Sequence, residues 1–162
     1  MRFAISLLCL FPMMAVAEEL PDDCSFDQAH LVGQLQALAK RIPGGRVDVS
    51  DHFVEWHLPE GEVVNAGQGG CYDLGTRVSI RFAKGRIPPR EVALKKLLKA
   101  VSTYWSKPEA RELSAALAQS DDKIELSGNG DFELQVPASK AFFQGFTILM
   151  SGDEISVSWI SG

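Results

Sequence analysis

The chain has 162 residues, of which 46% are hydrophobic and 23% are charged, and its 16 basic and 21 acidic side chains give a net charge of −5. This acidic balance counts against nucleic-acid binding, which relies on a surplus of basic side chains. After the first seventeen residues, no apolar run reaches the roughly 20 residues that a membrane-spanning helix needs. We therefore expect the mature chain to lack a membrane span.

The first seventeen residues have the pattern of a cleaved secretory signal peptide. Arg2 supplies a positive charge, an uncharged apolar run extends from Phe3 to Met14, and Ala15-Val16-Ala17 has the small-x-small pattern that signal peptidase accepts. Cleavage after Ala17 would leave 145 of the 162 residues, a size typical of one domain. We expect a periplasmic or secreted protein with a single domain over residues 18–162.

The cysteine count depends on that cleavage. Loss of Cys9 with the signal peptide leaves Cys24 and Cys71, and an even pair in an oxidising compartment predicts a disulfide bond. The closed loop of 48 residues would stabilise the fold by ~4 kcal/mol on the chain-entropy model. The alternative is that Cys71, which follows Gly69-Gly70, is the nucleophile of a thiol hydrolase. Papain-like enzymes place their histidine downstream, and the last histidine here is His57.

Hydrophobic periodicity predicts three helices separated by strands. Capping boxes begin two of the helices at Ser25 and Ser106, and a proline pair precedes the third. The expected helices span about 26–41, 88–106 and 106–119. Alternation of apolar and polar residues predicts half-buried antiparallel strands. They are expected near residues 47–49, 54–58, 62–65, 78–82, 124–127, 132–136, 146–150 and 155–160.

The order of these elements repeats along the chain. Displaced by 77 residues, the segment 46–50 matches 123–127 in chemical type, and 78–82 matches 155–159 in the same way. Residues 55–59 match 133–137 after a one-residue gap. This pattern favours an internal duplication, with repeats over 25–84 and 102–162. We expect an α+β fold in which each repeat is a helix packed on a four-stranded antiparallel meander, and the amphipathic helix 88–106 is mostly a connector.

Two clusters could be mistaken for catalytic or cofactor sites. Asp51, His52, Glu55 and His57 are dense enough to suggest zinc, but strand alternation puts His52 on the side of Trp56, opposite Glu55 and His57. Three ligands on one strand rarely enclose a tetrahedral ion. We therefore expect a solvated strand face and no metal.

The second cluster is the glycine-rich run 67–70. It lacks the Lys-Ser/Thr ending of a phosphate-binding loop, so we expect a mobile loop tethered by Cys71 there and no cofactor.

Positive charge is concentrated in one part of the sequence. Between Arg77 and Lys107 there are nine basic residues and a single acidic one, Glu91. They either balance acidic segments of the same molecule or form a docking surface, in which long-range charge raises the rate of association. The candidate binding surface comprises Arg77, Arg81, Lys84, Arg86, Arg90, Lys95, Lys96 and Lys99.

These features predict a small periplasmic binding protein without catalytic activity, such as an immunity protein or an inhibitor of an envelope-targeting enzyme. Its expected partner is an envelope protein. The alternative is a small envelope hydrolase that uses Glu55 and His57, or Cys71, as acid-base or nucleophilic groups.

Overall fold

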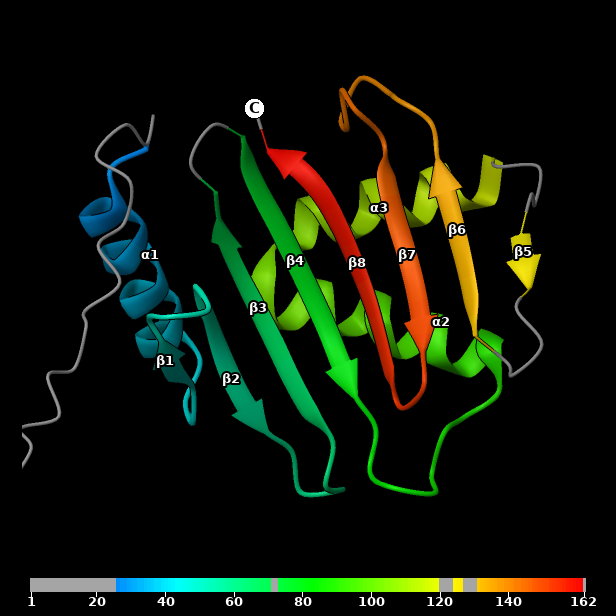
Figure 1. Cartoon of the computed structure of the whole chain (residues 1–162), viewed down its shortest axis with the longest axis horizontal. Helices are drawn as coiled ribbons and strands as arrows, with labels where there is room; N and C mark the ends of the chain where they lie inside the picture. The colour runs from blue at the N-terminus through cyan, green and yellow to red at the C-terminus, as the bar shows by residue number, and fades with distance from the viewer. Residues whose placement is uncertain (1–25, 71–72, 120–123, 127–130, 162) are drawn as a thin grey trace, which may run out of the picture.

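In the computed structural model, three helices pack on one face of a single antiparallel sheet (Figure 1). The structure describes residues 26–70, 73–119, 124–126 and 131–161. The expected α+β class is confirmed. The signal peptide, Cys24 and Cys71 lie outside the described residues.

Within the described residues the sheet has eight strands in the order β1-β2-β3-β4-β8-β7-β6-β5, and every neighbouring pair is antiparallel. The four strands of each half therefore pair in chain order, and β4 joins β8 at the centre. The strands are β1 (Arg46–Asp48), β2 (Phe53–His57), β3 (Val63–Gly69), β4 (Leu74–Arg81), β5 (Ile124–Leu126), β6 (Phe132–Val136), β7 (Phe146–Ser151) and β8 (Glu154–Ser161).

The core lies between the sheet and the helices. Alternate residues of each strand point to opposite faces of the sheet. The buried apolar residues of each central strand therefore share one face. In β2 these residues are Val54 and Trp56, and in β6 they are Phe132, Leu134 and Val136.

Helix α1 (Gln28–Arg41) lies at the β1–β3 end of the sheet and buries Leu35 and Leu38 in the shared core. Its N-cap is Asp27, whose carboxylate accepts a hydrogen bond from the His30 amide at 3.1 Å. The helix thus begins two residues later than the capping box at Ser25 predicts, because Asp27 is an equally good cap closer to the apolar stripe.

Helix α2 (Arg90–Ala100) is more than a connector. It contacts both β4 and β8, and Ala93, Leu97 and Ala100 are buried over their junction. It continues through a π-helical turn, η1 (Val101–Trp105), into α3 (Lys107–Gln119). The Ser106 hydroxyl accepts from the Glu109 amide at 3.4 Å, as the predicted capping box requires.

The glycine-rich run is strand rather than loop through Gly69. Gly67 stands opposite Phe53 of β2, and a Cβ atom there would lie 2.1 Å from the His52 carbonyl oxygen and 2.6 Å from the Phe53 Cα. Glycine in this strand therefore marks a close backbone approach, and the expectation of a loop from composition alone is wrong.

Candidate functional site

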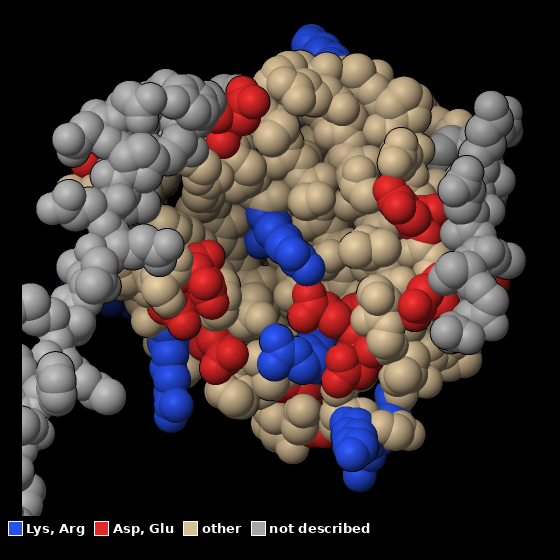
Figure 2. Space-filling model, in the orientation of Figure 1, with Lys and Arg blue, Asp and Glu red and all other residues tan. Residues whose placement is uncertain are grey.

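No helix of the described residues covers the second face of the sheet, and this face carries both acidic and basic side chains (Figure 2). Strand alternation brings residues of β4 and β8 together there, and Figure 2 shows basic and acidic side chains side by side over these two strands. The central residues on this face are Arg77, Ser79 and Arg81 of β4 and Glu154, Ser156 and Ser158 of β8.

One carboxylate is shared by two arginines at the centre of this face. Glu154 Oε1 lies 2.8 Å from Arg77 Nη2, and Glu154 Oε2 lies 3.7 Å from Arg81 Nε. The Arg77 and Arg81 side chains are 61% and 51% exposed, respectively. Such exposed pairs typically stabilise a fold by only about 0.2–1 kcal/mol. The cluster therefore matters more for what it presents to solvent than for holding the sheet together.

A groove of about 640 Å³ runs beside this cluster, over β3 and β4. Because Gly67, Gly69 and Gly75 have no side chains, the backbone forms part of its lining. Its other lining residues are Asp51, His52, Phe53, Asn65, Gln68, Gly70, Arg77, Ser79, Arg81 and Glu154.

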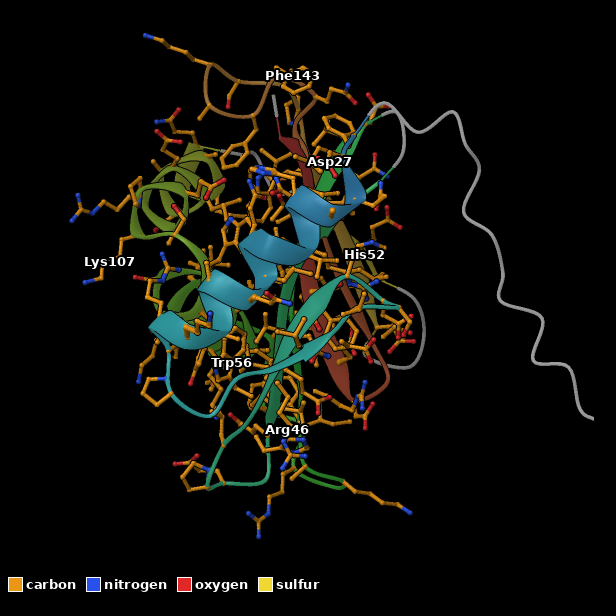
Figure 3. The ribbon with its side chains drawn as sticks, turned by 90° about the vertical axis from the view of Figure 1, so that its left-hand side faces the viewer. Asp27, Arg46, His52, Trp56, Lys107 and Phe143 are labelled. Atoms are coloured by element: carbon orange, nitrogen blue, oxygen red, sulfur yellow. The ribbon has the colours of Figure 1, made fainter. Side chains whose placement is uncertain are left out.

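His52 forms a wall of the groove. It has a φ of 56°, a left-handed conformation that is uncommon for residues other than glycine. A Cβ atom at Gly69 would lie 3.1 Å from the His52 Cβ, so the histidine sits over this glycine. Figure 3 shows His52 toward the uncovered side of the sheet and Trp56 toward the helices. The expectation that both share a face is wrong, because strand alternation does not extend through a left-handed residue.

Helix α1 fixes this wall from outside the sheet. His52 Nε2 lies 3.0 Å from Gln28 Oε1, and Gln28 Nε2 donates to the Gly70 carbonyl oxygen at 3.4 Å. The Gln28 side chain, in the first turn of α1, thus connects His52 to Gly70.

The β1–β2 turn carries His52 and is held by Asp48. The Ser50 hydroxyl donates to Asp48 Oδ1 at 2.6 Å, and the Asp51 amide donates to the same atom at 3.2 Å. These two hydrogen bonds, the hydroxyl first, hold the pKa of Asp48 below its usual value of 3.8. The turn therefore keeps its geometry while Asp48 is ionised.

Asn65 lines the groove, but its side-chain oxygen is buried beneath the surface. Its Oδ1 atom is buried and has no hydrogen-bond partner among the described residues. Asn65 stands between Glu55 of β2 and Ser79 of β4 in the sheet. A buried acceptor without a donor costs about 1–3 kcal/mol of stability.

The structure separates the basic residues that the sequence groups together. Arg77 and Arg81 lie on the uncovered face, whereas Lys95 and Lys99 are exposed on α2, behind the sheet. Lys96 forms an ion pair with Glu62.

The other three candidates have different surroundings. Lys84 and Arg86 are exposed in the segment between β4 and α2, and the Arg90 guanidinium lies 5.1 Å from the centre of the Phe132 ring. Only Arg77 and Arg81 among the eight candidates line the groove.

The Glu55 carboxylate and the His57 imidazole, which the sequence suggests as possible acid-base groups, lie close together. Glu55 Oε1 and His57 Nε2 are 2.7 Å apart on the uncovered face, where the His57 side chain is 60% exposed. Within the described ranges, no group of three or more histidine, cysteine, aspartate or glutamate residues is placed to hold a metal ion. No helix in the described part of the chain is long and apolar enough to cross a membrane.

Sequence reasoning missed His52, Asn65 and Ser79 as groove residues. Their proximity depends on the pairing of β2, β3 and β4, which a single sequence does not specify. The available signal was the spacing of Gly67 and Gly69 inside an alternating apolar segment, which indicates a strand with a hollow on one face.

Comparison with known proteins adds no functional assignment. No protein-family model, curated protein or solved structure matches the chain.

Proposed function

We propose that the chain is a small periplasmic binding protein without catalytic activity, which acts on an envelope protein as an inhibitor or immunity protein does. One observation carries the proposal: among the described residues, no helix covers one grooved, charged face of the sheet, while the opposite face supplies the core. Rigid strands position its side chains, which favours recognition by shape and charge. The proposed periplasmic location rests on the N-terminal sequence pattern alone.

The contact surface that we assign is the uncovered face around Arg77, Arg81 and Glu154. This revises the basic surface expected from sequence, because Lys95 and Lys99 belong to the opposite side of the molecule. A partner that docks on one side cannot engage both sets at once.

Matched charge reversals test this assignment. The immobilised mature chain is used to capture and identify a partner from envelope extracts, and association is then measured with Arg77→Glu and with Lys95→Glu. Both variants change one exposed positive charge by the same amount. We expect Arg77→Glu to slow association at least tenfold and Lys95→Glu to leave it within twofold. The reverse order would overturn the sheet face as the contact surface.

The fold also supports the proposal that the chain arose by internal duplication. The strand order is symmetric about the β4–β8 junction. Glu55 of β2 and Glu133 of β6 occupy the same row of the sheet on opposite sides of that junction, through successive pairs with Asn65, Ser79, Ser156 and Leu149. These two glutamates are the residues that the sequence comparison aligns after its one-residue gap.

A small envelope hydrolase is the second candidate, favoured by the Glu55–His57 pair. A carboxylate that holds an imidazole is a common arrangement for a general base. Turnover of an envelope polymer that His57→Ala abolishes and Lys95→Ala preserves would establish this activity and replace the binding proposal.

A further inference from the structure

The helix layer behind the sheet has an open groove of its own, of about 610 Å³, between α2 with η1 on one side and α3 on the other. Its charged lining residues are Lys99, Lys107 and Arg111, and no carboxylate of the described residues lines it. Its other lining residues are Leu98, Ser102, Ala110, Ser114, Ala115 and Ala118. Unlike the groove over β3 and β4, this one therefore carries charge of a single sign.

Helical spacing brings further exposed side chains to the same outer surface. Lys107 and Arg111 are four residues apart on α3, so they share the side of that helix that lines the groove. On α2, Val92, Lys95 and Lys99 follow one another at i, i+3 and i+7, and all three are exposed. Figure 3 shows Lys107 projecting away from the strands. We name this surface the helix-side basic face, and its cations are Lys95, Lys99, Lys107 and Arg111.

The cations of the helix-side basic face are not neutralised by acidic groups of the described residues. Lys96, on the flank of α2, pairs with Glu62, whereas none of the four cations of the face forms an ion pair within the described part of the chain. The exposed carboxylates of the two helices, Glu91 and Glu112, do not line the groove. Internal charge balance therefore accounts for Lys96 but not for this face, which is complementary to an anionic surface.

The composition of the helix-side basic face favours a lipid surface over a folded protein. Contacts between proteins are depleted in lysine and enriched in aromatic residues. Three of the four cations are lysines, and the exposed apolar side chain beside them is the aliphatic Val92. Among the exposed large hydrophobic side chains of the described residues, the one aromatic is Phe143, between β6 and β7. Lysines are strongly hydrated point charges, which suit a diffuse layer of lipid phosphates.

We propose that the helix-side basic face binds the surface of a membrane that contains anionic phospholipids, with its four cations beside the lipid phosphates and Val92 at the level of the headgroups. Each basic side chain near such a surface strengthens attachment about fivefold. The inference goes beyond the proposed function and uses the opposite side of the molecule. A chain attached in this way keeps the sheet face around Arg77 turned away from the lipid, where a protein partner has access to it.

Vesicle binding by the purified mature chain tests the inference. The probes are vesicles of phosphatidylglycerol mixed with phosphatidylcholine, vesicles of phosphatidylcholine alone, and soluble poly-glutamate as an acidic polypeptide. Sedimentation measures binding to the vesicles, and calorimetry measures binding to poly-glutamate. We expect binding to the anionic vesicles that is lost at high salt, because salt screens exposed charges. Equal binding to both kinds of vesicle, binding to neither, or poly-glutamate bound as tightly as the anionic vesicles would overturn the inference.

Two arginines on opposite sides of the molecule provide matched variants. Arg111→Gln should weaken binding to the anionic vesicles about fivefold, and Lys99→Gln combined with it should weaken binding about 25-fold. Arg46→Gln removes the same charge from an exposed residue of β1, which stands opposite Glu55 in the sheet. It should change binding by less than about twofold, because salt screens charges that lie far from the lipid. Equal losses in Arg111→Gln and Arg46→Gln would show that only net charge matters and would overturn the assignment of this face.

The outcomes separate this inference from the proposed function. The vesicle assay contains no protein partner, and the association assay contains no membrane, so Lys95→Glu remains a valid control in the second. A partner that depends on Arg77, combined with no vesicle binding, overturns the lipid-binding face and leaves the proposed function standing. Vesicle binding that depends on Lys99 and Arg111, without any protein partner, has the opposite meaning.

Discussion

Ser79 of β4 and Ser156 of β8 stand directly opposite each other at the centre of the sheet, and they are 77 residues apart in the chain. This is the displacement at which the two halves of the sequence resemble each other. Under the proposed duplication, Ser79 would pair with its own repeat equivalent and mark a local two-fold axis, as in the isologous interface of a dimer. Both serines are buried, at 3% and 6% exposure.

The junction at this axis predicts that the two halves unfold together. Eight residue pairs join β4 to β8, and Val78 and Val157, paired beside the axis, are buried in the shared core. Neither half can separate without exposing these residues, so we expect one cooperative transition. Urea unfolding followed by far-ultraviolet circular dichroism and by tryptophan fluorescence should give coincident curves. Two resolved transitions would show that the halves are independent domains.

Leu97 provides the sharpest test of the role of α2. It is 1% exposed and belongs to the core cluster over the central strands. Leu97→Ala should lower the free energy of unfolding by about 2–5 kcal/mol, since it leaves a cavity in the core. Val92→Ala on the same helix, where the side chain is 43% exposed, should change it by less than about 0.5 kcal/mol. Similar small effects at both positions would show that α2 is only a connector.

Two glycines with opposite surroundings test the packing of the groove lining. Gly67→Ala places a methyl group 2.1 Å from the His52 carbonyl oxygen, so the β2–β3 pairing must shift and stability must fall. Gly33 lies exposed inside α1, where an added methyl group would have open space around it. Gly33→Ala should therefore raise stability by about 0.5–1 kcal/mol, because alanine is the better helix former. Thermal unfolding of both variants measures the difference, and a neutral Gly67→Ala would contradict the close approach.

The sequence is sufficient to predict the helices and strands, but it does not show which of them pair or pack together. Local signals locate all the described strands, because alternation and turn residues act over a few positions. The β4–β8 pairing depends on contacts between distant segments, so the sequence does not show whether the two meanders join. The role of α2 is underestimated for the same reason: its apolar stripe identifies a helix without showing that the stripe covers the junction.

Errors at the candidate site have two local causes. Sequence alternation puts His52 on the wrong face because its positive φ interrupts the strand period. Gly67 and Gly69 suggest a loop because glycine usually punctuates structure, whereas here it permits close approach within a strand. Both errors concern residues that line the groove.

Ionisation of Tyr104 is expected to lower the free energy of unfolding at alkaline pH. Its ring packs against Trp56 with centroids 4.9 Å apart, and burial, followed by the negative charge of Glu60, raises its pKa above the usual 10.0. A raised pKa in the folded state favours the protonated phenol, so its contribution is complete below pH 10.0 and is lost as pH rises through the folded pKa. Denaturation midpoints measured across this range should fall less in Tyr104→Phe than in the natural chain. Identical losses in both proteins would exclude Tyr104 as the cause.

The Cys24–Cys71 disulfide stays a prediction from the sequence, because both cysteines lie outside the described residues. Gln28 follows Cys24 by four positions, and its side chain donates to the carbonyl oxygen of Gly70, the residue before Cys71. The same glutamine contacts His52, so a bond at this place would tie the first turn of α1 to the groove wall.

Thiol titration of unreduced, denatured mature protein should therefore find no free thiol, and Cys24→Ser with Cys71→Ser should lower stability by ~4 kcal/mol or less. Reduction of the natural chain should reproduce the stability of this double variant, because both treatments remove the same constraint from the unfolded state. Amide shifts at His52 and Gly70 should change in both cases, whereas those at Gln135, at the other half of the sheet, should not. Two titratable thiols in the unreduced protein would show that the bond is absent.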